Sequence, residues 1–571
     1  MHVKPEDRPI GKENFETAIA YSPDGMSRRK FLVGTLAAGA VSGAGLGAMY
    51  FGYGNSVEKP VRIAFIGTGD EGGVLIGAHT PSYAQCVAIA DIRSFNIHRA
   101  FHGDYSSDNA FQARPGLMAK YGWSSEDEAR KHVKVYSSYE DLLKAVQDKE
   151  LEIEGVIMAL PLHLHAEVAI KAMKAGLHVL TEKLMARTVA QCKEMGRVAK
   201  ETHKLLATGH QRHYSILYDN AIHTIKNGLL GDLHHIRAQW HRWKDTWSPP
   251  LPGDTAKEKS ALASVKRRQT EFERAKKPAD IEKMRRLLAQ TEKQFQDEVD
   301  AEAHGYKAKQ LPGGYKVSAL EELVRWRLWE RTGGGLMAEL GSHQLDAAGI
   351  FCTAVRDDGE KALPLTVMAT GGRHLYKEDR ECEDHVYCMY EYPGPKYEED
   401  PNKKIVVTYS SINGSPFGDY GESVMGTDRT LLLLREQEAL IFDNAGPSTK
   451  ISVGKADTLD TTASGGGAAV GKAAMEAGPI SRGYTEEIEH WAWCIRNPSE
   501  GNLPRCHPKV ALADAVIALT TNIAIRNPEH SRIVFKKEWF DIDSNETPEL
   551  DYLKEDRYKV TMDRPEYKPR A

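Results

Sequence analysis

The sequence contains few cysteines, and none of them stand in closely spaced pairs. Only seven occur among the 571 residues, and there is no C-x-x-C motif. An odd number of scattered cysteines argues against a complete disulfide framework, and no cysteine and histidine spacing resembles a structural zinc site. We therefore predict mostly buried thiols and no metal site. The cysteines are Cys86, Cys192, Cys352, Cys382, Cys388, Cys494 and Cys506.

The sequence also lacks an excess of charge of either sign. Its 75 Lys and Arg residues are balanced by 80 Asp and Glu residues, for a net charge of −5. No global cationic surface is therefore available for nucleic acid. Hydrophobic residues make up 41% of the chain and charged residues 27%, which is ordinary for a soluble globular protein and argues against disorder, collagen and a polytopic membrane protein.

A paired-arginine motif lies close to the N-terminus. Ser27-Arg28-Arg29-Lys30-Phe31-Leu32 precedes a glycine- and alanine-rich run from Val33 to Tyr53. This combination is similar to a twin-arginine export signal, although the run is also long enough for a membrane anchor. We predict a signal and n-region over residues 1–57 and a periplasmic or otherwise exported protein, with membrane attachment only through an uncleaved signal.

A glycine-rich turn follows the first β-branched run after this segment. Val61–Ile66 has the composition of a buried parallel strand and leads directly into Gly67-Thr-Gly69-Asp-Glu-Gly72, a G-x-G-x-x-G motif. In a dinucleotide-binding fold, Gly67 permits the tight turn, Gly69 lets the backbone approach a pyrophosphate, and Gly72 lets the next helix pack closely. We therefore predict that these three glycines bind the cofactor.

An acidic residue stands where such a fold needs one. A second strand, Cys86–Ala90, ends in Asp91, which is 19 residues beyond Gly72. A carboxylate at this place holds the ribose 2′-hydroxyl of the adenosine and repels a 2′-phosphate. Asp91 therefore favours NAD, whereas the nearby Arg93 leaves NADP open. The alternative is that Asp91 only ends a strand.

Alternating strands and helices continue to about residue 210, with predicted helices at 139–147 and 189–202. Pro161 and His165 follow the predicted strand at 155–160, and Glu182-Lys183 follows the strand at 178–181. Because ligands bind at the carboxyl edge of an open parallel sheet, these residues are candidate cofactor contacts. For His165 the alternative is a strand-end cap. The fold class is α/β, with a doubly wound Rossmann domain over residues 58–210.

Three motifs together resemble the Gfo/Idh/MocA oxidoreductases. They are Leu160-Pro161-x-x-x-His165, then Ala175-Gly-Leu-His-Val-Leu-Thr-Glu182-Lys183, and then Gly333-Gly-Gly-Leu-Met-Ala-Glu339-Leu-Gly-Ser-His343-Gln-Leu-Asp346. The resemblance implies a C-terminal α/β domain over residues 211–541 with an open, mostly antiparallel sheet. It also implies a homo-oligomer (dimer or tetramer) that oxidises or reduces sugars, inositols or related polyols with NAD(P).

Two positions depart from the family pattern. The family's E-K-P motif stands here as Glu182-Lys183-Leu184, so the proline that fixes φ and eases a cis peptide bond is absent. The presentation of Lys183 is therefore open. The family's D-x-x-x-H stands as Glu339-x-x-x-His343, in which the acid is one methylene longer.

The spacing of three residues also indicates a catalytic site without the resemblance. Glu339, His343 and Asp346 lie at i, i+4 and i+7, so one helical face would present a carboxylate, an imidazole and a second carboxylate. His343 is the candidate general base for a hydroxyl proton, oriented by Glu339 or Asp346. Lys183 would stabilise the developing alkoxide charge. A buried core histidine is the alternative for His343.

Weaker candidates for contacts with the substrate follow the Rossmann domain. Arg212 and Tyr214 stand at the domain junction, where hinge packing is the alternative to a sugar or cofactor contact. Trp243 lies between Trp240 and Trp247 in an aromatic-rich stretch. Such aromatic rings could stack on a sugar or could instead cover the adjoining insertion.

Two charged regions extend the domain plan. Residues from about 253 to 310 are rich in Glu, Lys, Arg and Ala, with Pro278 as a break, and predict a helical hairpin or a long helix pair inserted in the second domain. Its alternatives are a protein-partner arm and a solvated insertion. The tail over residues 542–571 is charged and is expected to lie across the surface.

Three functions remain open at this point. The first is an NAD(P)-dependent oxidoreductase that acts on a sugar or polyol CH–OH group with tightly bound cofactor, as the resemblance to glucose-fructose oxidoreductase suggests. The second is a glycosidase that uses NAD for transient sugar oxidation and elimination. The third is a non-catalytic sugar-binding protein that retains the fold.

Overall fold

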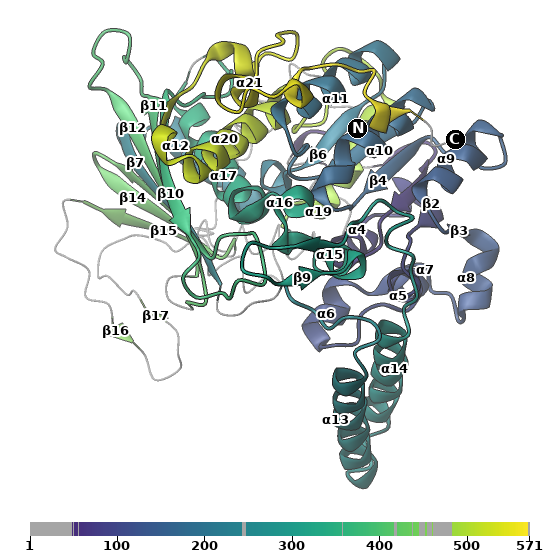
Figure 1. Cartoon of the computed structure of the whole chain (residues 1–571). Coiled ribbons are helices and arrows are strands. Elements are labelled where there is room, and N and C mark those ends of the chain that lie inside the picture. The colour runs from purple at the N-terminus through teal and green to yellow at the C-terminus, as the bar shows by residue number, and fades with distance from the viewer. Residues whose placement is uncertain are drawn as a thin grey trace, which may run out of the picture.

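The computed structural model describes residues 48, 51–54, 56–242, 247–356, 358–415, 419–436, 438–444, 452–453, 459–460 and 482–568. Two sheets dominate the chain, one from the N-terminal part and one from the C-terminal part, and helices fill the space between them (Figure 1). The arginine motif at 27–32 lies outside the described residues, as do most of the apolar run after it and Trp243.

The N-terminal sheet has six parallel strands in the order β3-β2-β1-β4-β5-β6, which confirms the predicted doubly wound Rossmann domain. The order reverses between β1 and β4, so a cleft opens there at the carboxyl ends of the strands. The strands are β1 Val61–Ile66, β2 Ala84–Ala90, β3 Lys134–Tyr136, β4 Gly155–Met158, β5 His178–Glu182 and β6 Leu206–Gly209.

Helices cover both faces of this sheet, and several begin at a side-chain cap. The Ser138 hydroxyl accepts from Asp141 N, and Thr188 does the same for Gln191 N, which explains why the predicted helices at 139–147 and 189–202 begin where they do. The helices are α4 Asp70–Ala78, α5 Ser94–His102, α6 Asp108–Ala113, α7 Gly116–Tyr121, α8 Glu126–His132, α9 Tyr139–Gln147, α10 His165–Lys174 and α11 Val189–Thr202.

The C-terminal sheet has eight strands in the order β15-β14-β13-β7-β12-β11-β10-β18, and only the β12–β7 pair is parallel. The predicted open, mostly antiparallel sheet is therefore confirmed. The strands are β7 Leu233–Arg242, β10 Thr366–Gly372, β11 His385–Pro393, β12 Lys404–Asn413, β13 Tyr420–Gly426, β14 Arg429–Leu434, β15 Glu438–Asp443 and β18 Arg532–Val534. Two short ribbons pair β8 Lys309–Gln310 with β9 Lys316–Val317, and β16 Ser452–Val453 with β17 Leu459–Asp460.

One face of the large sheet packs against helices, and the other faces outward (Figure 1). Its residues alternate accordingly: Val367 and Val386 are buried, whereas Met368, Tyr387 and Met389 are exposed. The second domain contributes α12 Ile216–Lys226, α15 Ala319–Val324, α16 Glu330–Gly333, α17 Ser342–Ala354, α19 Tyr484–Arg496 and α20 Pro508–Arg526, and the tail contributes α21 Pro548–Tyr552.

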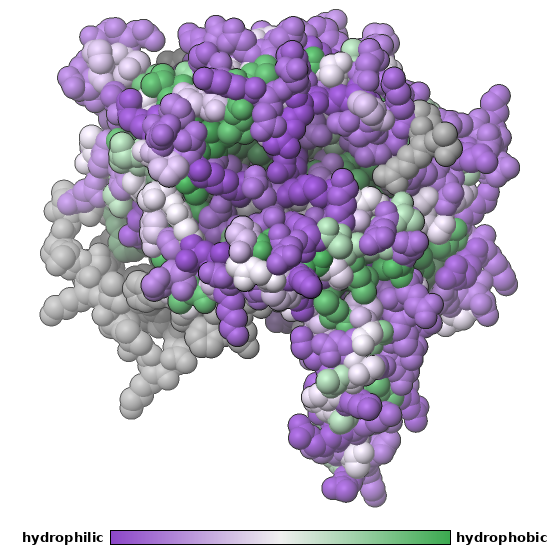
Figure 2. Space-filling view, in the orientation of Figure 1, coloured by the Kyte–Doolittle hydropathy of each residue, from purple (hydrophilic) through white to green (hydrophobic). Residues whose placement is uncertain are grey.

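The charged insertion is a helical hairpin, as predicted. Helices α13 Thr255–Arg274 and α14 Pro278–Phe295 pack against each other and project from the body, and Pro278 is the first residue of α14 (Figure 1). The face of the hairpin that Figure 2 shows is mostly hydrophilic, with a few apolar residues among the polar ones. The base of the hairpin contacts α5 of the Rossmann domain, so the insertion joins the two domains at that point.

Both ends of the described chain pack on the Rossmann domain. The carbonyl oxygen of Gly54 accepts from the hydroxyl of Tyr83, which directly precedes β2, at 2.7 Å. The tail lies against α11, where Lys193 Nζ donates to the carbonyl oxygen of Glu546 and Glu194 accepts from Arg564. Of the described helices, α20 alone is long and apolar enough to cross a membrane, and 78% of that window is buried inside the protein.

Candidate functional site

A cleft of about 830 Å³ lies between the two domains at the switch point of the Rossmann sheet. Its walls come from the β1–α4 turn, the ends of β2, β4 and β5, the segment before α17, strand β7 and the base of the insertion. The predicted site residues that line it are Gly67, Gly69, Asp91, Pro161, Glu182, Lys183, Glu339 and His343.

The glycine turn has the geometry that its motif predicts. Gly67 has a φ of +83°, which an L side chain rarely adopts. A Cβ on Gly72 would lie 2.1 Å from the carbonyl oxygen of Gly67, so the start of α4 can pack here only because Gly72 has no side chain. A Cβ on Gly69 would meet nothing closer than 3.7 Å. The backbone at Gly69 therefore faces open space in the cleft.

Asp91 ends β2 and faces the glycine turn. Its Oδ2 accepts from Thr68 N at 2.7 Å, and its Oδ1 accepts from Arg93 N at 2.9 Å. Asn96 Nδ2 also approaches both carboxylate oxygens. Burial raises the pKa of Asp91 above its usual value, although the hydrogen bonds from these donors work to lower it. Asp91 is therefore a fixed acceptor at the adenosine end of the cleft.

Lys183 follows β5 and reaches across to the other domain. Its Nζ donates to the carbonyl oxygen of Glu339 at 2.6 Å and lies 3.8 Å from Glu339 Oε2. The Lys183–Leu184 peptide bond is cis although residue 184 is not proline. The lysine that the motif singled out thus lies in the cleft beside the predicted catalytic helix.

His165 does not line the cleft, and its ring contacts the backbone of the segment that follows Lys183. Its Nδ1 lies 2.8 Å from the carbonyl oxygen of Leu184, and its Nε2 lies 2.9 Å from that of Leu160. Burial lowers the pKa of His165. This geometry corresponds to the strand-end cap, whereas the neighbouring Pro161 lines the cleft itself.

Glu339 lies in a π-helical turn, Met337–Gly341, that continues into α17. Its Oε1 accepts from Arg327 Nε at 2.7 Å. Burial works to raise the pKa of the Glu339 carboxyl, but Arg327, Lys183 and Arg242 outweigh it and hold that pKa at about 2. Glu339 is therefore an ionised partner for the cations of the cleft.

His343 is the first histidine after this turn and lines the cleft. Its ring packs beside the Trp240 ring, with centroids 5.3 Å apart and planes tilted by 38°. No described residue hydrogen-bonds to the ring of His343. Burial, followed by the nearby Lys183 and Arg212, holds the pKa of His343 well below its usual value. The imidazole is therefore neutral at physiological pH and able to accept a proton.

Asp346 differs from the sequence prediction, because it does not share the cleft with Glu339 and His343. Its Oδ1 accepts from His213 Nε2 at 2.8 Å and from Lys361 Nζ at 3.2 Å. Burial works to raise the pKa of Asp346, but its interactions with His213 and Lys361 hold it well below its usual range. Both residues lie on α17, but this buried network holds the Asp346 carboxylate away from the cleft that His343 lines.

Arg212 and Tyr214 also lie outside the cleft lining. Arg212 is buried in an ion pair with Glu436 Oε1 at 2.8 Å. The Tyr214 hydroxyl accepts from Arg505 N at 2.8 Å and contacts the His490 ring. These positions match the hinge-packing alternative. Of the aromatic stretch, Trp240 and Trp247 line the cleft, whereas Trp243 lies outside the described residues.

A second carboxyl, Glu71, lies opposite Glu182 and was not recognised in the sequence. Both line the cleft, and Oε1 of each is buried without a hydrogen bond among the described residues. Burial, and then the mutual repulsion of the two carboxyls, raises the pKa of Glu182 to about 8. Burial also raises the pKa of Glu71. Glu71 occupies a variable position of the glycine motif, so nothing in that motif identified it.

Other parts of the cleft also had no sequence signal. Arg327 and Arg242 bring positive charge from the second domain. The insertion supplies Gln290 and Gln294, and Tyr306 follows from the adjoining segment; all three line the adenosine end. These residues are distant from the Rossmann motifs in the sequence, so only the folded chain places them there.

Comparison with known sequences agrees with this geometry. Residues 61–210 match the sequence model of an oxidoreductase family with an NAD-binding Rossmann fold, GFO_IDH_MocA. An uncharacterized oxidoreductase of Schizosaccharomyces pombe is 32% identical over 137 residues, which are 22% of this chain and 36% of that protein. A 2,7-anhydro-N-acetylneuraminate hydratase of Mediterraneibacter gnavus is 29% identical over 109 residues, or 19% of this chain and 29% of that protein.

The chain spans only about a quarter to a half of the length of the curated relatives that it matches. The similarity extends further in solved structures. An inositol dehydrogenase homolog of Azotobacter vinelandii, complexed with NADH and myo-inositol, superposes with a TM-score of 0.51 at 13% identity. That superposition covers 84% of this chain and 98% of the other, so the two proteins share a fold. Together these matches show that residues 61–210 are similar to the NAD-binding domain of the GFO_IDH_MocA oxidoreductase family and that the chain shares the fold of the inositol dehydrogenase homolog.

Proposed function

We propose that this protein is an oxidoreductase that uses NAD to oxidise or reduce a CH–OH group of a sugar or polyol. One observation carries the proposal: Lys183 from the Rossmann domain and His343 from the second domain line the same cleft as the glycine turn. A hydride transfer needs a dinucleotide site, a proton acceptor and a group that stabilises charge on the reacting oxygen. The cleft offers all three.

The chain's own residues supply the proton chemistry and the orientation. Neutral His343 would accept the hydroxyl proton of the substrate, and the Lys183 ammonium would stabilise negative charge on the same oxygen. Glu339 holds Lys183 from one side while Arg327 holds Glu339. Trp240 gives an apolar ring beside His343 on which a sugar can stack. Bound nicotinamide would supply the hydride acceptor or donor.

The residues present fit a dinucleotide. The open backbone at Gly69 leaves room for a pyrophosphate at the N-terminus of α4. Burial raises the pKa of Glu71, so this acid in the first turn of α4 adds less negative charge near the phosphates. Asp91 Oδ1 receives its one short hydrogen bond from Arg93 N, which leaves this oxygen able to accept a ribose hydroxyl.

A second carboxylate, Asp297, supports NAD over NADP. It follows α14 of the insertion, and its side chain is fully buried. Its Oδ2 accepts from Arg93 Nε at 2.7 Å, and its Oδ1 accepts from Ser94 Oγ at 2.9 Å and Phe95 N at 3.1 Å. These donors follow β2, where NADP-dependent folds hold the 2′-phosphate. Asp297 therefore occupies the donors that a 2′-phosphate would need.

Replacing Asp297 with asparagine tests this cofactor choice. The amide removes the negative charge and frees Arg93, so we expect the Kd of NADP⁺ to fall at least about tenfold, while the Kd of NAD⁺ changes less than about threefold. Isothermal titration of the purified protein measures both constants without relying on activity. Glu298→Gln removes an adjacent, exposed charge and serves as the control. Unchanged NADP⁺ affinity in a folded D297N protein would leave Asp91 as the only discriminating group.

We further propose that the cofactor stays bound through the catalytic cycle. Support comes from the insertion, which adds Gln290 and Gln294 to the adenosine end of the cleft, so that both domains enclose this end. Mass spectrometry of nucleotide released from the folded protein, followed by a panel of sugars and polyols monitored for cofactor reduction, tests the function. Protein that carries no nucleotide and binds none on reconstitution would overturn the proposal.

A redox-assisted elimination is the second candidate, and the hydratase relative favours it. The same His343 and Lys183 would serve a transient oxidation of the sugar followed by loss of a substituent. Cleavage or hydration of the substrate with no net cofactor reduction, together with solvent exchange at a sugar carbon, would identify this chemistry. Net reduction in the sugar panel identifies the first candidate.

Export and assembly complete the proposal. The paired arginines at 28–29 support the twin-arginine route and a periplasmic location, which cell fractionation of the wild type and of a twin-lysine variant tests.

The exposed Met368, Tyr387 and Met389 on the outer face of the large sheet support a homo-oligomer. Light scattering of the purified protein measures its mass in solution.

A further inference from the structure

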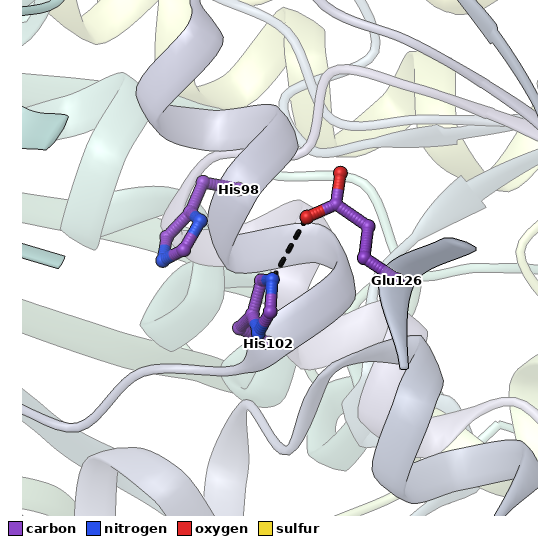
Figure 3. A group of neighbouring side chains, drawn as sticks. All are labelled: His98, His102 and Glu126. Carbon is purple, nitrogen blue, oxygen red and sulfur yellow. Dashed lines mark hydrogen bonds and ion pairs between the residues drawn. The ribbon is translucent and has the colours of Figure 1, made fainter. Parts of the chain in front are cut away.

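Three potential metal ligands meet on the Rossmann domain outside the cleft (Figure 3). His98 and His102 lie one turn apart on α5, so both imidazoles project from the same face of the helix. Glu126 is the first residue of α8 and approaches His102 from that neighbouring helix. Neither the proposed mechanism nor the proposed cofactor site uses any of these side chains.

Their distances suit one shared ion. His102 Nε2 lies 2.8 Å from Glu126 Oε2, and the two histidine rings stack with centroids 4.3 Å apart. One ligand atom from each of the three side chains lies within 4.8 Å of the others. Bonds of about 2.0–2.2 Å from nitrogen and oxygen to a central metal need only small rotations of these side chains.

The groups around the cluster orient it without filling its centre. Arg130 on α8 donates to Glu126 Oε1 at 2.7 Å, which leaves Oε2 directed toward His102. Such a contact behind a ligand fixes its orientation. The cationic groups of Arg99 on α5 and Lys293 on α14 also act on His98. These two positive charges disfavour a divalent ion, whereas the negative charge of Glu126 favours it.

Two other groups of potential ligands carry no comparable inference. Both contain Asp514, together with His210 and Cys506 or with His213 and Asp346. Lys361 Nζ already lies 2.5 Å from Asp514 Oδ1 and contacts Asp346 as well. The ammonium therefore supplies the positive charge that a metal would otherwise bring.

We propose that His98, His102 and Glu126 form a binding site for a divalent transition metal of the zinc class. Two imidazoles and one carboxylate favour Zn²⁺, Ni²⁺ or Cu²⁺ over Mg²⁺ or Ca²⁺, which prefer oxygen ligands. The half-buried position leaves a fourth coordination place for water. Because the ligands come from α5 and α8, the ion ties these two helices together.

Titration of the chelator-treated full chain with ZnCl₂ tests the site. We expect about one equivalent of Zn²⁺ to bind and to raise the Tm, with reversal by EDTA and no effect of MgCl₂. His102→Ala and Glu126→Gln should each weaken Zn²⁺ binding at least about tenfold. His234→Ala, which removes an exposed histidine of β7, is the matched control.

The outcome is independent of the proposed function, because binding and Tm are measured without substrate or cofactor. Zn²⁺ binding that survives both His98→Ala and His102→Ala in folded protein would overturn the site, and so would the absence of Zn²⁺ binding by the wild type. Circular dichroism of each variant establishes that it is folded before the comparison is made.

Discussion

Replacing Lys183 with methionine is expected to lower kcat at least about 100-fold while the protein remains folded and binds its nucleotide. Methionine keeps much of the length of the lysine side chain but has no charge. Removal of one preorganised donor at a developing oxyanion costs about 10²–10³ in kcat. The same substitution removes the hydrogen bond from Lys183 Nζ to the carbonyl oxygen of Glu339, so substrate positioning also suffers.

Steady-state kinetics with the best sugar or polyol from the panel provides the measurement. Lys174→Met, at the exposed end of α10, removes a lysine of the same kind away from the cleft and should leave kcat unchanged. The Kd for the nucleotide separates a chemical defect from a binding defect. If K183M retains wild-type kcat, Lys183 does not act on the reacting oxygen, and the proposed mechanism fails at that step.

Replacing His343 with glutamine is expected to lower kcat by about 10²–10⁴, the contribution of a positioned general base. Glutamine keeps a polar side chain beside Trp240 but cannot accept a proton at neutral pH. A base must be deprotonated to act, and burial together with nearby cations holds the pKa of His343 well below its usual value. Wild-type kcat/KM should therefore stay high as the pH falls through 6.5 and decline only at lower pH.

His235→Gln is the matched control for this variant. His235 lies on β7, and its Nε2 contacts the Thr408 hydroxyl on the neighbouring strand, outside the cleft. We expect its pH profile to match that of the wild type. An H343Q protein with unchanged kcat would show that another group accepts the proton, whereas a wild type that binds sugar without any turnover in the panel would support the non-catalytic sugar-binding alternative.

Sequence patterns predicted the Rossmann domain closely because its signals are local. The β-branched run at Val61–Ile66, the glycine turn and the capping residues each act within a few positions of the chain. The predicted helices at 139–147 and 189–202 have the observed boundaries. The insertion was also predictable as a hairpin, since its composition and Pro278 define two helices without reference to the rest of the chain.

The second domain was less predictable at the level of single side chains. His343 and Asp346 both lie on the regular helix α17, but the Asp346 carboxylate pairs with His213 and Lys361 and does not line the cleft. These partners are up to 133 residues away in the sequence. No local pattern reports a contact of that kind, and the same holds for the buried pairing of Arg212 with Glu436.

The sequence by itself determined the main strands of the Rossmann domain, the dinucleotide turn and the identity of Lys183, Glu339 and His343 as candidates, because short-range spacing and backbone constraints define them. Only the tertiary structure decided which of these side chains share a cleft and that Asp297 of the insertion forms an ion pair with Arg93. Such choices depend on burial and on charges that meet across domains, and those charges have no fixed spacing along the chain.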